Sequence, residues 1–199
     1  MSVPSDERLE RWLRALISTP GLTAIQDLDE ARRVHLDESL AAVDVVRRFD
    51  GPVVDVGSGG GAPGIPLAAC LPEREVVLLE ANGRKCAFLR LVAREFPNVS
   101  VAQGRAEEQE TDVFGVATAK ALAPPVVALE WCLPLVAPGG AAVLFVGPSA
   151  EADRVAEAAK KLGGGGLEEL AGLLVAPKVE PTPAGFPRRV GVARKRPLA

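Results

Sequence analysis

Apolar residues in the first 50 positions recur with the spacing of amphipathic helices. Members of the first stripe lie three and four positions apart, on one helix face that must dock on another surface: Leu9, Trp12, Leu13, Leu16 and Ile17. The turn Thr19-Pro20-Gly21 ends this helix, and a second helix is predicted from about 29 to 49. Residues 1–50 are therefore predicted to form a helical extension that packs on the rest of the chain.

The pattern changes at Pro52, where short apolar runs replace the helical spacing. These runs do not alternate with polar residues, which is typical of strands buried on both faces of a parallel sheet. The predicted strands are 52–56, 76–79, 99–102, 113–118, 141–146, 173–176 and 189–192, with helices at 65–71, 83–96, 125–136 and 150–162. This alternation predicts one α/β domain over 51–199, a doubly wound seven-stranded sheet that binds its ligand beyond the strand C-termini.

Composition sharpens this picture by exclusion. With 48% apolar residues in 199, the chain can bury a substantial core and is not predicted to be disordered. No apolar run approaches the roughly 18 residues that span a bilayer, and the N-terminal residues lack the apolar core of a signal peptide. We therefore expect a soluble, cytoplasmic protein.

Few side chains suit acid–base or metal chemistry. Cys70, Cys86 and Cys132 form no CxxC pair, and His35 is the single histidine, so buried free thiols are predicted and no metal site is expected. His35 is predicted to pack or cap a helix. No GxSxG nucleophile motif is present, which favours chemistry that needs no side-chain base.

The glycine-rich segment after the first predicted strand carries the strongest sign of a ligand. Gly59, Gly61 and Gly64 satisfy the dinucleotide pattern G-x-G-x-x-G. Pro63 and Pro66, however, remove two N–H donors that would hold a pyrophosphate. Asp55, just before the glycines, would oppose a polyanion but suit S-adenosylmethionine, which is cationic and carries no phosphate. Glu80, at the end of the second strand, is placed to accept the ribose hydroxyls of either cofactor.

Longer motifs make the resemblance specific. The segments Asp55–Leu67, Leu78–Arg90 and Gln103–Glu108, together with His35-Leu36-Asp37-Glu38-Ser39-Leu40, closely resemble the RsmG family, also called GidB. The likeness extends over most of residues 30 to 198. It implies a Rossmann-like class I S-adenosylmethionine-dependent methyltransferase fold, and transfer of a methyl group to guanine N7 in small-subunit (16S) ribosomal RNA.

The resemblance also implies roles for single residues. Carried over by position, the cofactor would be bound by the loop residues Gly57, Gly59, Gly61 and Ala62, by Glu80 at the ribose, by Ala106 and Glu107 at the adenine, and by Lys120. Glu80 replaces the usual aspartate, Lys120 replaces an arginine, and Val146 stands where the family has a lysine. The departures at Lys120 and Val146 fall on the presumed substrate side of the site. The first matters because arginine offers a planar fork of donors and lysine a point charge.

Charge is unevenly distributed around a net value of −3. Residues 181–199 hold five cations and no acid, and four of these cations are candidates for contacts to the RNA backbone: Arg188, Arg189, Arg194 and Lys195. The alternative is that they are only solvated. Ribosomal RNA or a small-subunit particle is the expected partner, and we expect a monomer without metal or membrane contact.

Guanine N7 has a lone pair and no proton to lose, so its methylation needs no general base. Lys120 is the one candidate for a catalytic contact. Three other functions stay open: a small-molecule methyltransferase on the same fold, a nicotinamide-dependent oxidoreductase, and a divergent cofactor-binding protein with weak or no activity.

Overall fold

The computed structural model describes residues 6–147 and 151–199, and their strands form one seven-stranded sheet. Its order is β3-β2-β1-β4-β5-β7-β6; β1 to β5 run parallel, while β7 is antiparallel to both β5 and β6. The strands are β1 (Val53–Val56), β2 (Val76–Glu80), β3 (Val99–Gln103), β4 (Phe114–Lys120), β5 (Val136–Phe145), β6 (Glu168–Leu170) and β7 (Leu173–Pro177). The doubly wound, mostly parallel sheet predicted from the apolar runs is confirmed.

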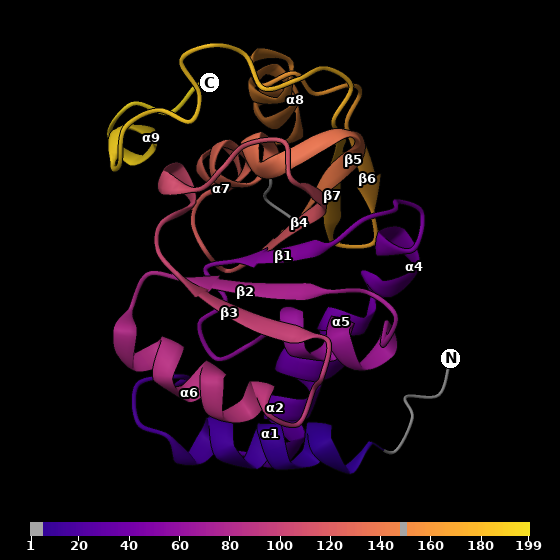
Figure 1. Cartoon of the computed structure of the whole chain (residues 1–199), viewed down its shortest axis with the longest axis vertical. Helices are drawn as coiled ribbons and strands as arrows, with labels where there is room; N and C mark the ends of the chain where they lie inside the picture. Colours follow the sequence, from indigo (N-terminus) through magenta and orange to yellow (C-terminus); the bar gives the residue numbers. More distant parts are fainter. Residues whose placement is uncertain (1–5, 148–150) are drawn as a thin grey trace.

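Helices cover both faces of the sheet, as Figure 1 shows with α5 and α6 below it and α7 and α8 above it. They are α1 (Glu7–Ser18), α5 (Gly64–Cys70), α6 (Gly83–Ala93), α7 (Pro125–Cys132), α8 (Ala152–Lys161) and α9 (Val192–Lys195), with short 3₁₀ turns at Ala106–Glu108 and Leu133–Leu135. The predicted start of α8 at residue 150 lies outside the described residues. The sheet has a core on each face: the lower core lies against α1, α5 and α6, and the upper core lies against α7 and α8. Val53 belongs to the lower core and Val54 to the upper core, so β1 is buried on both faces.

One predicted strand is wrong, and one observed strand was not predicted. Residues 189–192 form a turn at Gly191 (φ +80°) and the start of α9, not a strand. Glu168–Leu170 instead pairs with β7 and completes the sheet at that edge. Arg188 provides the physical reason, because its ion pair with Glu130 holds the chain against α7, away from the sheet edge.

The predicted second helix is broken into short pieces: α2 (Leu28–Ala31), the π-helix η1 (Arg32–Asp37), α3 (Glu38–Leu40) and α4 (Val43–Val46). The carbonyl of Val34 accepts a hydrogen bond from the ammonium group of Lys120. The N–H of Glu38 bonds to the carbonyl of Arg33, five residues back. The contact with Lys120 thus accompanies a local π-turn that apolar spacing alone does not encode.

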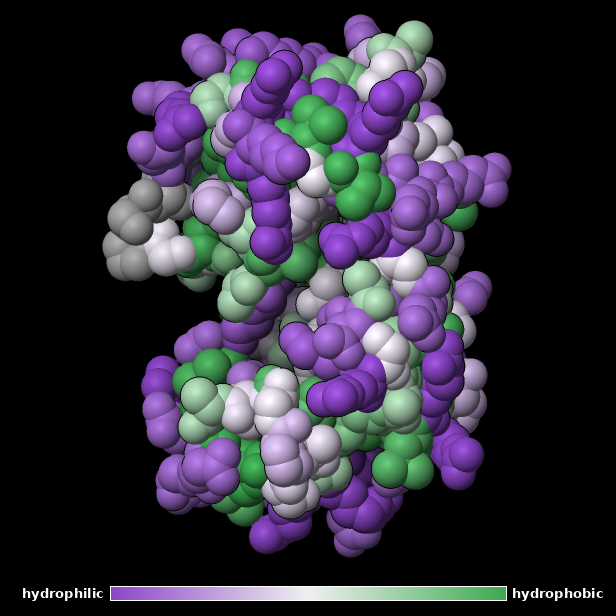
Figure 2. Space-filling view, turned by 90° about the vertical axis from the view of Figure 1, so that its left-hand side faces the viewer, coloured by the Kyte–Doolittle hydropathy of each residue, from purple (hydrophilic) through white to green (hydrophobic). Residues whose placement is uncertain are grey.

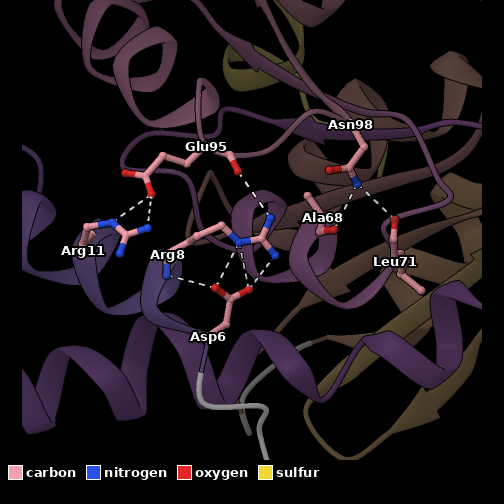
Figure 3. A network of polar contacts seen from close by, with 7 residues as sticks. All are labelled: Asp6, Arg8, Arg11, Ala68, Leu71, Glu95 and Asn98. Carbon is pink, nitrogen blue, oxygen red and sulfur yellow. Dashed lines mark hydrogen bonds and ion pairs between the residues drawn. The ribbon is translucent and has the colours of Figure 1, made fainter.

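Helix α1 docks through the predicted stripe, since Leu9, Trp12, Leu13 and Leu16 are all buried. Polar contacts fix its N-terminal half (Figure 3): Asp6 caps the helix and binds Arg8, while Arg11 pairs with Glu95 at 2.6 Å. Its apolar residues share one core with Val53 and Ile65. The division of the chain at residue 50 stays a prediction. In the part of the chain that the structure describes, no helix is long and apolar enough to cross a membrane.

Candidate functional site

A cavity of about 310 Å³ lies at the edge where the parallel strands end. Figure 2, which looks at this side of the molecule, shows it hollowed between its upper and lower parts. Four residues predicted to bind the cofactor line the cavity: Gly57, Glu80, Ala106 and Glu107. The segments after β1, β2 and β3 therefore converge on one site, as parallel strands require.

Gly57 begins the glycine-rich loop and lies beside the cavity. Its φ of +70° is in the left-handed region, and a Cβ there would overlap the Leu122 side chain, which lines the cavity from the other side. A larger residue would therefore both strain the backbone and fill the cavity. Contact of Gly57 with the cofactor stays a prediction.

Three other glycines are explained by packing within the protein. A Cβ on Gly60 would overlap Leu16 of α1, and one on Gly61 would lie 2.9 Å from Ile65 Cγ1 and 3.2 Å from Trp12 Nε1. A Cβ on Gly64 would overlap Leu78. Gly61, the one of these three predicted to bind the cofactor, thus faces α1, and its contact with the cofactor stays a prediction.

The two carboxylates near the loop have different environments. Asp55 is buried beneath the loop, where it accepts hydrogen bonds from the Gly64 N–H at 3.1 Å and the Thr118 hydroxyl at 3.3 Å. Burial raises the pKa of Asp55 to about 7. Asp55 is not among the residues that line the cavity, so its predicted influence on ligand charge is not a direct contact.

Glu80 is the carboxylate at the cavity wall. Its Oε2 accepts the Gly59 N–H at 3.0 Å and its Oε1 accepts the Asn82 N–H at 2.8 Å, so the side chain is fixed in one orientation. Each carboxylate oxygen keeps acceptor capacity for a further donor. This geometry fits a ligand that presents a pair of hydroxyl groups.

Other predicted cofactor residues lie outside the cavity lining. Gly59 acts through its N–H on Glu80, Gly61 faces α1, and Ala62 packs against the lower core. Lys120 ends β4, one residue before the cavity residue Ala121. Its ammonium group is held by the Val34 carbonyl and by Glu38, 3.1 Å away. The structure therefore does not bring Lys120 to the cavity that Glu80 lines.

The C-terminal cations also differ in their surroundings. Arg188 forms a two-pronged ion pair with Glu130, whose side chain is only 2% exposed, so its guanidinium is engaged within the protein and its contact with RNA stays a prediction. Arg194 lies over the ring of Trp131, 5.1 Å from its centroid, and both residues line the cavity. Arg189 and Lys195 are exposed. The cavity wall also holds Trp131, Lys85 and Arg105, which were not named as site residues. Lys85 and Arg105 nevertheless lie within the motifs Leu78–Arg90 and Gln103–Glu108 that carry the family resemblance.

A second cavity of about 520 Å³ adjoins the first and shares Leu122 and Arg194 with it. Its walls are mostly apolar and come from residues 122–127 and the first turn of α8, with Glu151 and Arg154 among the lining residues. Glu151 and Arg154 pair with each other. The site thus offers a polar cavity and an adjacent apolar one.

His35 and the cysteines lie outside both cavities. The His35 Nε2 is 3.1 Å from the Thr23 hydroxyl, and burial together with the nearby Lys120 charge lowers its pKa, consistent with the predicted packing role. All three cysteines are free; Cys86 and Cys132 are buried and Cys70 is partly exposed. Among the described residues, no three His, Cys, Asp or Glu side chains gather as metal ligands would.

Known proteins with similar sequences share one description. A family model described as rRNA small subunit methyltransferase G (GidB) matches residues 6–168. The chain is 37% identical to ribosomal RNA small subunit methyltransferase G of Synechococcus elongatus, over 89% of this chain and 82% of that protein. For the Thermotoga petrophila protein of the same name, identity is 34%, over 98% and 92%.

Solved structures show the same fold. A SAM-dependent O-methyltransferase from Thermotoga maritima matches with a TM-score of 0.59 at 16% identity, over 82% of this chain and 73% of that chain. The family expected from the sequence motifs and the α/β methyltransferase fold are both confirmed. The chain therefore belongs to the rRNA small subunit methyltransferase G family, a family of S-adenosylmethionine-dependent methyltransferases.

Proposed function

We propose that this chain transfers the methyl group of S-adenosylmethionine to N7 of a guanine in small-subunit (16S) ribosomal RNA. The observation that carries the proposal is the convergence of Gly57, Glu80, Ala106 and Glu107 on one cavity, in a chain of this family. The cofactor supplies an electrophilic methyl group on sulfur, which N7 attacks with its lone pair. No proton must be removed, so a side-chain base is not needed.

The residues of the cavity divide the work of binding. Glu80 would accept the ribose hydroxyls, because its two oxygens are held in place by the N–H groups of Gly59 and Asn82. Ala106 and Glu107 would border the adenine, and the bare Cα of Gly57 would let the cofactor lie close to the loop. Catalysis would come from positioning, which can contribute on the order of 7–11 kcal/mol when reactants are well oriented.

The second cavity is our candidate for the target guanine. It adjoins the cofactor cavity through Leu122 and Arg194, and its apolar walls suit the faces of a base. Arg189 and Lys195 are exposed and lie close in sequence to Arg194, which lines this cavity. They would contact RNA phosphates. Lys120 lines neither cavity and enters the proposal only as the residue that precedes Ala121 of the cavity wall.

Calorimetry with S-adenosylmethionine tests the cofactor site. We expect Glu80→Ala and Gly57→Asp each to weaken binding at least tenfold, because the first removes the acceptor and the second fills the cavity. Glu110→Ala, which removes an exposed carboxylate outside the cavity lining, is the matched control and should bind as wild type does. Unchanged affinity in both site variants would overturn the assignment.

Mapping of N7-methylguanine tests the substrate. Ribosomal RNA and small-subunit particles from a strain that lacks this family's enzyme would be incubated with the cofactor and with wild type or Ala123→Trp, which narrows the second cavity. We expect wild type to form N7-methylguanine in the ribosomal RNA. We expect Ala123→Trp to lose most of this activity while it keeps its affinity for the cofactor. Cofactor binding without any RNA methylation would favour a small-molecule methyltransferase or an inactive relative.

The inactive alternative rests on Lys120. Its ammonium group contacts Glu38 and the Val34 carbonyl, so it is not free to bind the cofactor or RNA as the arginine of the family would. Single-turnover methyl transfer to RNA by the wild-type chain would exclude this alternative.

A further inference from the structure

Helix α1 contacts the cofactor loop directly, through a single hydrogen bond. Trp12 is 2% exposed, and its Nε1 donates to the carbonyl of Gly60 at 2.8 Å, across 48 positions of sequence. We propose that Trp12 is a positioning residue for cofactor binding, which acts through the loop and touches no cofactor itself. The inference rests on the proposed function, because it needs this loop to hold S-adenosylmethionine.

The loop is held from two sides at neighbouring residues. On one side the Gly60 carbonyl receives the Trp12 N–H, and on the other the Gly59 N–H is donated to Glu80. The orientation of these adjacent backbone groups therefore couples α1 to the carboxylate at the cavity wall. Loss of the bond from Trp12 would free the loop to turn and would disturb the Gly59 N–H, one of the two N–H groups that orient Glu80.

Steric contacts show that the loop is fitted to α1. Gly60 lies so close to Leu16 that a Cβ could not be added, and the space beside Gly61 ends at the indole nitrogen of Trp12. The backbone of the loop thus lies flat on this helix. This contact accounts for the glycine at position 60, whereas Gly61 also has a φ of +102° that favours glycine.

Helix α1 has other anchors, so the hydrogen bond of Trp12 can be removed without removing the helix. Arg11 pairs with Glu95, and Arg8 donates to the Glu95 carbonyl (Figure 3). Leu9 and Leu13 are buried in the core. Trp12→Phe keeps an aromatic ring in the core while it deletes the N–H donor together with part of the ring volume, and the control variant below measures what lost volume alone does. Together the two variants separate positioning from packing.

We expect Trp12→Phe to raise the dissociation constant for S-adenosylmethionine about fivefold, the equivalent of one hydrogen bond of about 1 kcal/mol. The KM for the cofactor should rise with little change in kcat. Leu9→Ala is the control, because it removes a buried side chain of the same helix one turn away. It should lower the melting temperature more than Trp12→Phe does and leave the dissociation constant of the folded protein unchanged.

Hydrogen exchange of residues 57–61, followed by mass spectrometry without cofactor, gives a second readout. Faster exchange of this segment in Trp12→Phe than in Leu9→Ala shows that the Trp12 bond orders the loop, whether or not the chain binds S-adenosylmethionine. If wild type binds none, the proposed function has failed, and the role of Trp12 in cofactor binding fails with it. Wild-type exchange together with wild-type affinity in Trp12→Phe would overturn the proposal. So would an equal loss of cofactor affinity in the two variants.

Discussion

Asp55 is a buried carboxyl group whose ionisation is coupled to folding. Because its pKa is raised from 3.8 to about 7 in the folded chain, the folded state binds more protons than the unfolded state between these values. Its contribution to stability is therefore fully present below pH 4 and is lost as the pH rises towards 7. The full effect is at most about 4 kcal/mol, from 1.36 kcal/mol per pKa unit.

Asp55→Asn tests this coupling. The amide oxygen can still accept the Gly64 N–H, and the amide group can donate to the Thr118 hydroxyl, but it does not ionise. We expect the free energy of unfolding, measured by urea denaturation from pH 4 to 7, to fall less steeply with pH than in wild type. Parallel pH profiles for the two proteins would contradict the raised pKa.

Single residues also show what the sequence could reveal about the site. Gly57, Glu80, Ala106 and Glu107 could be predicted because local motifs place them at strand ends that meet in any parallel sheet. The positions of Trp131 and Trp12 could not be predicted in this way, because α7 and α1 bring them to the cavity and to the loop from distant parts of the chain. Lys120 was misplaced because nothing local indicates that Glu38 would bind it.

At the scale of elements, the segment after residue 186 is held to α7 by one buried charge pair. Arg188 contacts both oxygens of Glu130, and the carbonyl of Arg196 accepts a further hydrogen bond from the same guanidinium. Further along the chain, the Gly191 N–H donates to Glu107 at 3.3 Å. The pair therefore fixes a segment that borders the cavity.

We expect Arg188→Ala to lower the free energy of unfolding by about 3 kcal/mol, because it leaves the Glu130 carboxylate buried without its partner. Chemical denaturation measures this loss. Arg189→Ala removes the neighbouring exposed cation and should leave stability within about 0.5 kcal/mol of wild type. Equal stability of the two variants would show that the charge pair does not hold the segment.

Elements of the sheet were predictable to the extent that burial marks them. Strands β1, β2, β4 and β5 contain apolar runs, and each was found within a few residues of its observed position. The edge strand β3 was also found, through Val99 and Val101, although none of its residues is fully buried. Strand β6 contains Glu168 and Glu169 and lies at the sheet edge, where polar residues are tolerated and the apolar signal is lost. Residues 189–192 resemble a strand locally, but the tertiary contact of Arg188 directs them over α7.

For the whole molecule, charge separation governs the approach of RNA. All 26 acidic residues precede residue 181, whereas the last 19 residues carry five cations. An acidic body repels a polyanion and a cationic segment attracts it, so the field favours encounters at the segment that borders the cavity. Two exposed cations of this segment, Arg189 and Lys195, are not used in ion pairs within the described part of the chain.

This separation predicts how salt affects RNA binding. If Arg189 and Lys195 each neutralise one phosphate, replacing both with alanine should reduce the slope of log K against log salt concentration by about 1.4 for single-stranded RNA. Arg90→Ala with Arg94→Ala removes the same charge from exposed positions on and just after α6, and is the matched control. Binding of ribosomal RNA fragments from 50 to 300 mM salt, about the range over which such contacts weaken, measures both slopes. An equal reduction in the two double variants would mean that net charge, and not the C-terminal segment, attracts the RNA.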